Sequence, residues 1–164
     1  MLNSSLCYLI RDNHYLMLHR VKKENDANHD KWIGIGGKFE DKESPEECMI
    51  REVHEETGLK VNSWHYHGIV TFVSDCWETE YMHLFTSDSF TGDADNIFCD
   101  EGVPEWIPIR DVSNLPQWEG DRLFLNLLQS NASFFSLKLV YSGDSLSSAT
   151  LNGSAIPLPN FTNR

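Results

Sequence analysis

The chain has 164 residues, of which 40% are hydrophobic and 12% aromatic, so it is long enough for one domain with an ordinary hydrophobic core. Its formal net charge of −12 argues against a nucleic-acid polymer as its partner, because binding to a phosphate backbone depends on clustered Lys and Arg. We expect a single domain over residues 1–145.

The N-terminal segment predicts a β-hairpin. Residues 6–10 and 15–18 read as strands, and Asp12 and Asn13 suit the turn between them. Polar residues interrupt the apolar runs here, so we expect neither an export signal nor a membrane span. The cysteines form no C-x-x-C pair, which favours reduced thiols and a cytoplasmic location. A polar loop is expected next, at residues 22–31.

The most clearly marked element is a helix expected over residues 45–57. Ser44 suits its N-cap, Pro45 suits the first helical position, and Glu47 completes a capping-box pattern. Gly58 follows the last turn, where glycine adopts the left-handed conformation without a Cβ penalty.

Beyond this helix the chain alternates between strand and helix patterns. Strands are expected at residues 61–72, 80–85, 103–107 and 136–141, with a second helix at residues 120–128. The last segment, residues 146–164, is rich in Ser, Asn, Gly and Pro and lacks hydrophobic periodicity. We therefore expect a poorly ordered C-terminal tail there.

Carboxylates crowd the first helix and the turn before it: Glu43, Glu46, Glu52, Glu55 and Glu56. In a helix with 3.6 residues per turn, positions 52, 55 and 56 project from one face and repel each other. Hard divalent ions bind through a few carboxylates together with substrate phosphates. The cluster therefore predicts a metal-assisted phosphate site.

The spacing of these residues resembles the signature of the Nudix hydrolase superfamily. That signature reads G-x5-E-x7-R-E-U-x-E-E-x-G-U, where U is aliphatic, and the segment from Gly37 to Leu59 matches it at every defined position. The resemblance implies the Nudix fold, which is an α/β (α+β) architecture with a mixed β-sheet sandwiched between α-helices. It also implies hydrolysis of a nucleoside diphosphate linked to a further group.

Residue by residue, the resemblance implies a metal site on the first helix. Glu52, Glu55 and Glu56 would ligate Mg²⁺, or Mn²⁺ as a substitute, together with a backbone carbonyl near Gly37. The metal would activate a water for attack on a phosphorus atom. Arg51 would hold one glutamate in position, because its guanidinium fork suits a carboxylate held in one geometry.

The same resemblance gives the remaining roles around the helix. Glu43 and Gly58 would support the box structurally, as would Gly37. The group that takes the proton from the attacking water stays open among Glu55, Glu56 and an acid outside the box. That outside acid would be Glu101, whose surroundings resemble a loop that supplies an extra metal-binding glutamate; the alternative is a polar turn before a strand.

The base site is expected near the second helix. Residues 115–121 resemble the MutT/MutX-like subgroup that hydrolyses 8-oxo-dGTP and related oxidised purine nucleotides. There Trp118 would stack on the purine, and Glu119 or Asp121 would accept hydrogen bonds from the base. The alternative is that Trp118 fills the core and Asp121 caps the helix.

The segment before the first helix departs from the animal enzymes of that subgroup. Trp32 is followed by Ile33, where those enzymes carry an asparagine that touches the base, and Gly120-Asp121 stands where they carry paired aspartates. The run from Trp32 to Lys38 instead resembles bacterial relatives of the MutT or MutX type. Ile33 and Lys38 are therefore further candidates for substrate binding.

The leading prediction is a cytoplasmic, Mg²⁺-dependent pyrophosphohydrolase that cleaves purine dNTPs, 8-oxo-dGTP in particular, to the monophosphate and pyrophosphate. Such an enzyme would cleanse the nucleotide pool and so serve DNA repair. Its partner would be a small nucleotide, with no nucleic-acid polymer and no membrane, and its oligomeric state is left open. Alternatives are hydrolysis of dinucleoside polyphosphates, ADP-ribose or nucleotide sugars, or a non-catalytic nucleotide sensor, although sensors typically lose the box carboxylates that this chain keeps.

Overall fold

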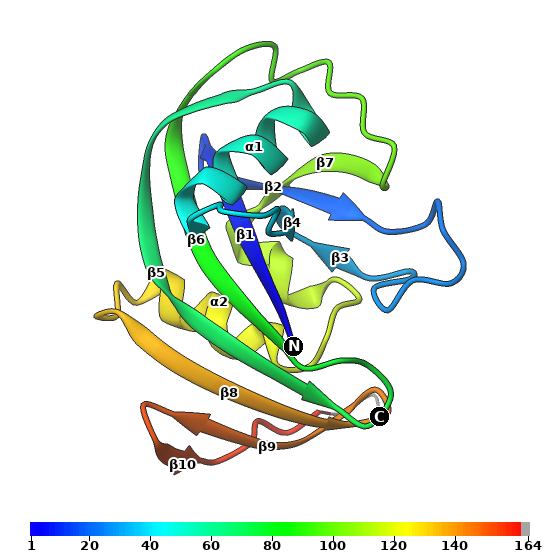
Figure 1. Cartoon of the computed structure of the whole chain (residues 1–164), viewed down its shortest axis with the longest axis vertical. Helices are drawn as coiled ribbons and strands as arrows, with labels where there is room; N and C mark the ends of the chain where they lie inside the picture. The colour runs from blue at the N-terminus through cyan, green and yellow to red at the C-terminus, as the bar shows by residue number, and fades with distance from the viewer. Residues whose placement is uncertain (162–164) are drawn as a thin grey trace.

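The structure, a computed structural model, describes residues 1–161 and contains one mixed β-sheet and two α-helices (Figure 1). The strands are β1 (Leu2–Arg11), β2 (His14–His19), β3 (Trp32–Ile33), β4 (Ile35–Lys38), β5 (Lys60–Ser74), β6 (Glu80–Thr91), β7 (Val103–Pro108), β8 (Phe135–Ser142), β9 (Ser145–Leu151) and β10 (Ser154–Ile156). The helices are α1 (Pro45–Thr57), a 3-10 helix (Ile109–Asn114) and α2 (Asp121–Gln129). This mixed architecture confirms the predicted α+β class.

The strands run in the order β10-β9-β8-β5-β6-β1-β2-β3, with β4 paired to β1 and β7 paired to β2. Two pairings are parallel, β1 with β6 and β5 with β8, and the others are antiparallel. In this register Leu6 lies beside Leu84, and Val70 lies beside Leu137. The parallel pairings therefore align buried apolar side chains at the centre of the sheet.

Alternate side chains of β1 serve the two faces of the sheet, as the two-residue period of a strand requires. Leu6 and Tyr8 pack in the cluster that contains the buried side of α2. Cys7 and Leu9 pack in a second cluster, which contains the buried side of α1. The sheet is therefore sandwiched between the two helices, as expected.

Helix α1 begins and ends where the sequence predicts. The Ser44 hydroxyl accepts the Glu47 backbone N–H at 3.1 Å, and the Glu47 carboxylate accepts the Ser44 N–H at 2.9 Å, so the capping box is complete. Gly58 ends the helix with φ 76°, in the left-handed region. The Ser5 hydroxyl donates to the Pro45 carbonyl at 2.7 Å, which ties the start of α1 to β1.

Strand β4 carries the glycines that precede α1 and lies directly on β1. A Cβ atom on Gly36 would be 1.9 Å from the Ser5 carbonyl oxygen, so only glycine allows this approach. Gly36 pairs with Leu6 in the ladder. As a result the backbone of β4 lies between β1 and the acidic helix.

The prediction of a poorly ordered tail at residues 146–164 is wrong for its first part. Strands β9 and β10 extend the sheet to Ile156, and residues 162–164 lie outside the described part of the chain. Leu146 and Ala149 are buried against β8, too short a pattern to register as periodicity. The missed signal is Asn152-Gly153, both at positive φ, which is the strongest short-range hairpin signature.

Helix α2 starts at Asp121, and Gly120 is its N-cap without a side-chain hydrogen bond. Phe124, Leu125 and Leu128 are its buried apolar residues. Within residues 1–161, neither helix is long and apolar enough to cross a membrane.

Candidate active site

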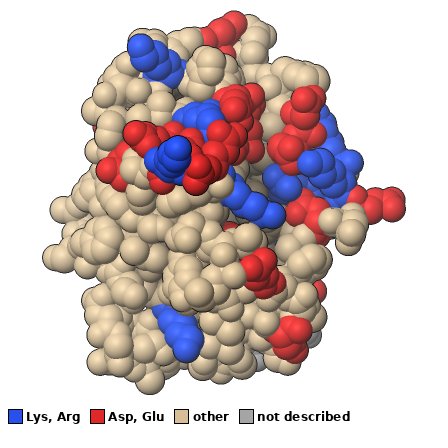
Figure 2. All heavy atoms as spheres, viewed as in Figure 1, with Lys and Arg blue, Asp and Glu red and all other residues tan. Residues whose placement is uncertain are grey.

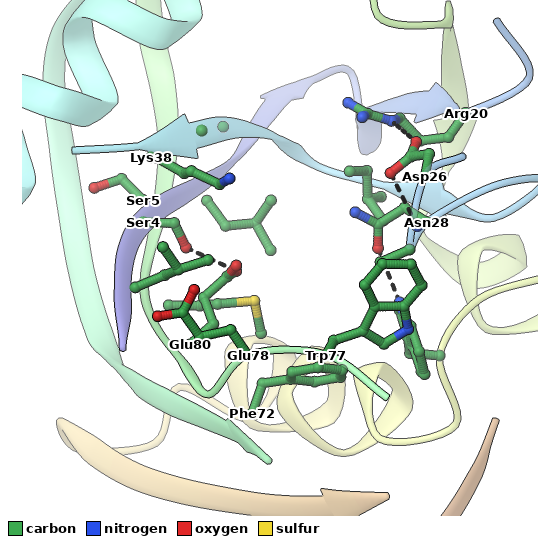
Figure 3. Close-up of a pocket in the computed structure, with 18 of the residues that line it drawn as sticks. Ser4, Ser5, Arg20, Asp26, Asn28, Lys38, Phe72, Trp77, Glu78 and Glu80 are labelled. Carbon is green, nitrogen blue, oxygen red and sulfur yellow. Dashed lines mark hydrogen bonds and ion pairs between the residues drawn. The ribbon is translucent and has the colours of Figure 1, made fainter. Parts of the chain in front are cut away.

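A cavity of about 520 Å³ lies between β1, β4, the loop after β2 and the start of α2. Figure 2 shows acidic side chains, with Lys and Arg among them, gathered over α1 at the edge of a hollow in this face. Figure 3 shows polar and aromatic side chains that ring the cavity. The lining includes Ser4, Arg20, Asp26, Asn28, Ile33, Gly36, Gly37, Lys38, Phe72, Trp77, Glu80, Trp118 and Asp121.

Arg51 is the centre of the charged network on α1. Its Nε and Nη2 atoms donate to both oxygens of Glu43, at 2.7 and 2.8 Å. Its Nη1 atom donates to Glu52 at 2.7 Å and to Glu55 at 3.1 Å, and Nη2 also reaches the Lys38 carbonyl at 3.1 Å. The hydrogen bond from Arg51 lowers the pKa of Glu43. The guanidinium thus holds three carboxylates in fixed positions relative to β4.

Gly37 makes room for the carboxylate of Glu52. A Cβ atom at this position would lie 2.4 Å from the Glu52 carboxyl carbon and 2.6 Å from each of its oxygens. The Glu52 side chain is 14% exposed, and its carboxylate lies against the backbone of Gly37, which itself lines the cavity. Any larger residue at position 37 would displace it.

Glu56 is the buried acid of α1. The sequence predicted its place on the acidic face of the helix but not its burial. Burial, and then the nearby charge of Glu52, raise its pKa to about 8, although Arg20 opposes the shift. Its Oε2 atom is buried and has no hydrogen-bond partner among residues 1–161. A buried, unsatisfied carboxylate oxygen is costly and fits a site that receives a cation.

Glu101 joins this group from the loop before β7. Its carboxylate accepts from Lys23 at 2.9 Å and lies 3.6 Å from Arg20. Its charge also contributes to the raised pKa of Glu56, so the two acids are neighbours. Glu101 therefore lies near the buried acid of α1, with Lys23 and Arg20 beside it, and its role as a metal ligand stays a prediction.

The donor set fits a hard divalent cation. Among residues 1–161, no three carboxylate, imidazole or thiol groups converge on one point, and Arg51 hydrogen-bonds to Glu52 and Glu55. The open oxygen of Glu56 and the carboxylate of Glu52 against Gly37 are oxygen donors beside the backbone of β4. Such donors suit Mg²⁺ or Mn²⁺ in combination with substrate phosphates.

At the other end of the cavity, Trp118 packs in the hydrophobic core and also lines the cavity. The predicted stacking role and the alternative core role are therefore compatible. It is 5% exposed, and its Nε1 atom donates to the Asn28 side chain at 2.8 Å. Phe72 and Tyr141 contact it edge-on, and the Lys31 ammonium lies 4.5 Å from its ring centre. The indole forms a rigid inner wall.

Asp121 lies beside this wall and does not cap α2 through its side chain. Its carboxyl is buried at the cavity wall. Burial raises its pKa to about 8 against the opposing charges of Arg122 and Lys31. A buried carboxyl at a cavity wall suits a hydrogen bond to a ligand.

Glu119 is not placed at the cavity. Its carboxylate accepts the Leu146 backbone N–H at 2.6 Å and so fastens β9 to the segment before α2. The prediction that Glu119 contacts the base overlooked the C-terminal hairpin, which supplies this partner. Ile33 and Lys38 do line the cavity, with Lys38 at the end nearer the acidic helix.

Several residues of the loop after β2 line the cavity but were not predicted from the sequence. Arg20 donates to Asp26 at 2.8 Å, Asp26 accepts the Asn28 N–H at 3.1 Å, and Asn28 accepts from Trp118. These bonds tie together a segment that the sequence predicted only as a polar loop. The alternation of Asp and Asn, typical of side-chain to backbone turns, was the available signal.

The buried carboxyl of Asp121 leads to a prediction about pH. Its folded-state pKa of about 8 lies above its ordinary value of 3.8, so the folded protein keeps a proton that the unfolded chain releases. Stability should therefore fall as the pH rises through this window, by roughly 2 kcal/mol between about pH 6 and 8. Urea unfolding at several pH values should show this fall in the free energy of unfolding. Asp121→Asn should remove the part of the fall that Asp121 contributes. An unchanged slope in Asp121→Asn would contradict the assignment.

Comparison with known proteins identifies the family of this site. A model of the NUDIX domain matches residues 2–128. The chain is 30% identical over 141 residues to the uncharacterized Nudix hydrolase YvcI of Bacillus subtilis, covering 83% of this chain and 84% of that protein. It is 34% identical over 106 residues to the oxidized purine nucleoside triphosphate hydrolase of Danio rerio, covering 63% and 66%. The crystal structure of a MutT protein from Bacillus halodurans superposes with a TM-score of 0.79 at 23% identity, covering 93% and 98%.

Proposed function

This chain belongs to the Nudix family and is a hydrolase, and from that premise we propose that it converts purine deoxynucleoside triphosphates to the monophosphate and pyrophosphate. The proposal includes 8-oxo-dGTP among the substrates. The observation that carries it is the arrangement of one cavity with two different ends. Gly36 and Gly37 of β4 line one end, with the Glu52 carboxylate against Gly37, and the Trp118 indole and the buried Asp121 carboxyl line the other.

The acidic end supports the hydrolysis. Glu52, Glu55 and Glu56 would hold Mg²⁺, with Glu101 as a further ligand, and the ion would supply charge neutralisation of the phosphates and an activated water. In the reaction one P–O bond of the α–β anhydride breaks, and one forms to the water oxygen. Within this site the carboxylates of Glu55, Glu56 and Glu101 are the groups able to accept the water proton. Arg51 holds the carboxylates of Glu52 and Glu55 in position through hydrogen bonds.

The other end supports a purine as the base. Trp118 offers a flat inner wall, and Asp121 offers a carboxyl that accepts or, when protonated, donates a hydrogen bond to the base edge. The relative in Danio rerio is named as an oxidized purine nucleoside triphosphate hydrolase. Ile33 adds an apolar contact at the same cavity, and Lys38 adds a positive charge for the phosphates. We place the reaction in the cytoplasm, where it would remove damaged precursors before DNA synthesis.

The test is a substrate panel with separate detection of phosphate and pyrophosphate, with and without Mg²⁺. The panel holds dGTP, 8-oxo-dGTP, dATP, dCTP, a dinucleoside polyphosphate, ADP-ribose and a nucleotide sugar. We expect Mg²⁺-dependent pyrophosphate release with the highest kcat/KM on a purine triphosphate. A higher kcat/KM on ADP-ribose or a dinucleoside polyphosphate would overturn the substrate assignment. Equal values for 8-oxo-dGTP and dGTP would remove the preference for oxidised bases.

A further inference from the structure

Trp77 is a large aromatic side chain that lines the cavity and is still 44% exposed. Among the described residues, ring contacts join Trp118 to Phe72 and Tyr141, but none involves Trp77. In Figure 3 its indole stands at the cavity edge, across from Ser4, Ser5 and Lys38. An exposed indole at the mouth of a ligand cavity has apolar surface that a bound ring could cover.

The turn that carries Trp77 is fixed on three sides. The Ser74 hydroxyl accepts the backbone N–H of Cys76 at 3.0 Å and that of Trp77 at 3.2 Å. The Asp75 carboxylate accepts the Gly143 N–H at 2.9 Å, which fastens the turn to the β8–β9 hairpin. After Trp77, the Glu78 carboxylate pairs with the N-terminal amine. The indole is therefore presented from a rigid turn, and its position costs little ordering entropy on binding.

The inner wall of the cavity is arranged differently. Trp118 is 5% exposed, its Nε1 atom is held by Asn28, and the Lys31 ammonium lies against its ring. That indole is fixed by its neighbours before any ligand arrives. Trp77 is the aromatic ring of the cavity lining with the most surface still open to a ligand.

We propose that Trp77 closes the outer side of the base site by stacking on the nucleobase, and that this contact gives purines an advantage over pyrimidines. The inference rests on the proposed function in placing a nucleotide in this cavity. A two-ring base covers more of the indole than a one-ring base does, so stacking favours purines through contact area. It does not read hydrogen-bonding groups, and that task belongs to Asp121.

Binding of dGMP and dCMP in the presence of Mg²⁺, measured by calorimetry, tests the inference. Trp77→Ala should raise the Kd of dGMP about tenfold and that of dCMP less, so that the preference between them narrows. Trp77→Phe keeps a stacking ring and should stay within about threefold of the unaltered protein. Trp64→Ala is the matched control, because Trp64 is 41% exposed but does not line this cavity.

Two results would overturn the inference. One is a Trp77→Ala protein that binds dGMP as tightly as the Trp64→Ala protein does. The other is no binding of dGMP by the unaltered protein. Failure of the proposed function looks different: the unaltered protein binds dGMP and Trp77→Ala weakens that binding, but no triphosphate is hydrolysed.

Discussion

Replacing Glu56 with glutamine is expected to lower kcat by at least about 10³-fold while leaving the fold intact. Glutamine matches the shape of the buried carboxyl but is neutral at every pH, so it can neither neutralise a divalent cation nor take a proton from water. Glu56 has a buried oxygen without a partner among residues 1–161. The loss should therefore appear in turnover, measured at saturating Mg²⁺, with the unfolding transition little changed.

Glu47→Gln is the matched control for this substitution. Glu47 lies on the same helix and is exposed, and glutamine at this position still completes the capping box with Ser44. The control should keep kcat within about twofold of the unaltered protein, since no contact of the site changes. If Glu56→Gln turns over as fast as Glu47→Gln does, the metal role of Glu56 is refuted.

Replacing Arg51 with alanine is expected to reduce both stability and activity. Its guanidinium bonds three carboxylates, and two of them, Glu43 and Glu52, are 14% exposed at the side chain. Without it these charges stay close together and unpaired. Because the Arg51 side chain is 20% exposed, we expect the free energy of unfolding to fall by about 2 kcal/mol, which is less than the loss of a fully buried ion pair. Displacement of Glu52 and Glu55 should lower kcat/KM by about 10²-fold.

Two further variants make this prediction specific. Arg51→Lys keeps the positive charge but lacks the planar fork, so it should recover only part of the stability and little of the activity. Arg110→Ala removes an arginine that is 87% exposed and lies 4.0 Å from Asp111, and it should change neither quantity measurably. Urea unfolding and steady-state kinetics give both readouts. Equal results for Arg51→Ala and Arg110→Ala would contradict the network.

The first helix could be predicted from the sequence because its signals are local. Ser44 and Glu47 act on each other within one turn, and Gly58 needs only its own backbone freedom. The acidic face follows from helical spacing alone. The burial of Glu56 could not be predicted, because it depends on β4 and the loop after β2, which reach the helix from distant parts of the chain.

The end of the cavity near Trp118 depends on contacts between distant parts of the chain. The segment before α2 pointed to Trp118 and Asp121, and both line the cavity. Glu119, in the same segment, instead holds β9, because the C-terminal hairpin that we expected to be poorly ordered is part of the sheet. Trp77 lies in a turn between two strands, where no local pattern distinguishes a ligand-facing aromatic residue from a surface one.

The most direct test of the proposed hydrolysis is phosphorus NMR of the products when the unaltered protein acts on dGTP in Mg²⁺. We expect dGMP and pyrophosphate in equal amounts, with the reaction abolished by chelation of the metal and by Glu56→Gln. Release of orthophosphate with dGDP, or turnover at an unchanged rate after Mg²⁺ is removed, would contradict it.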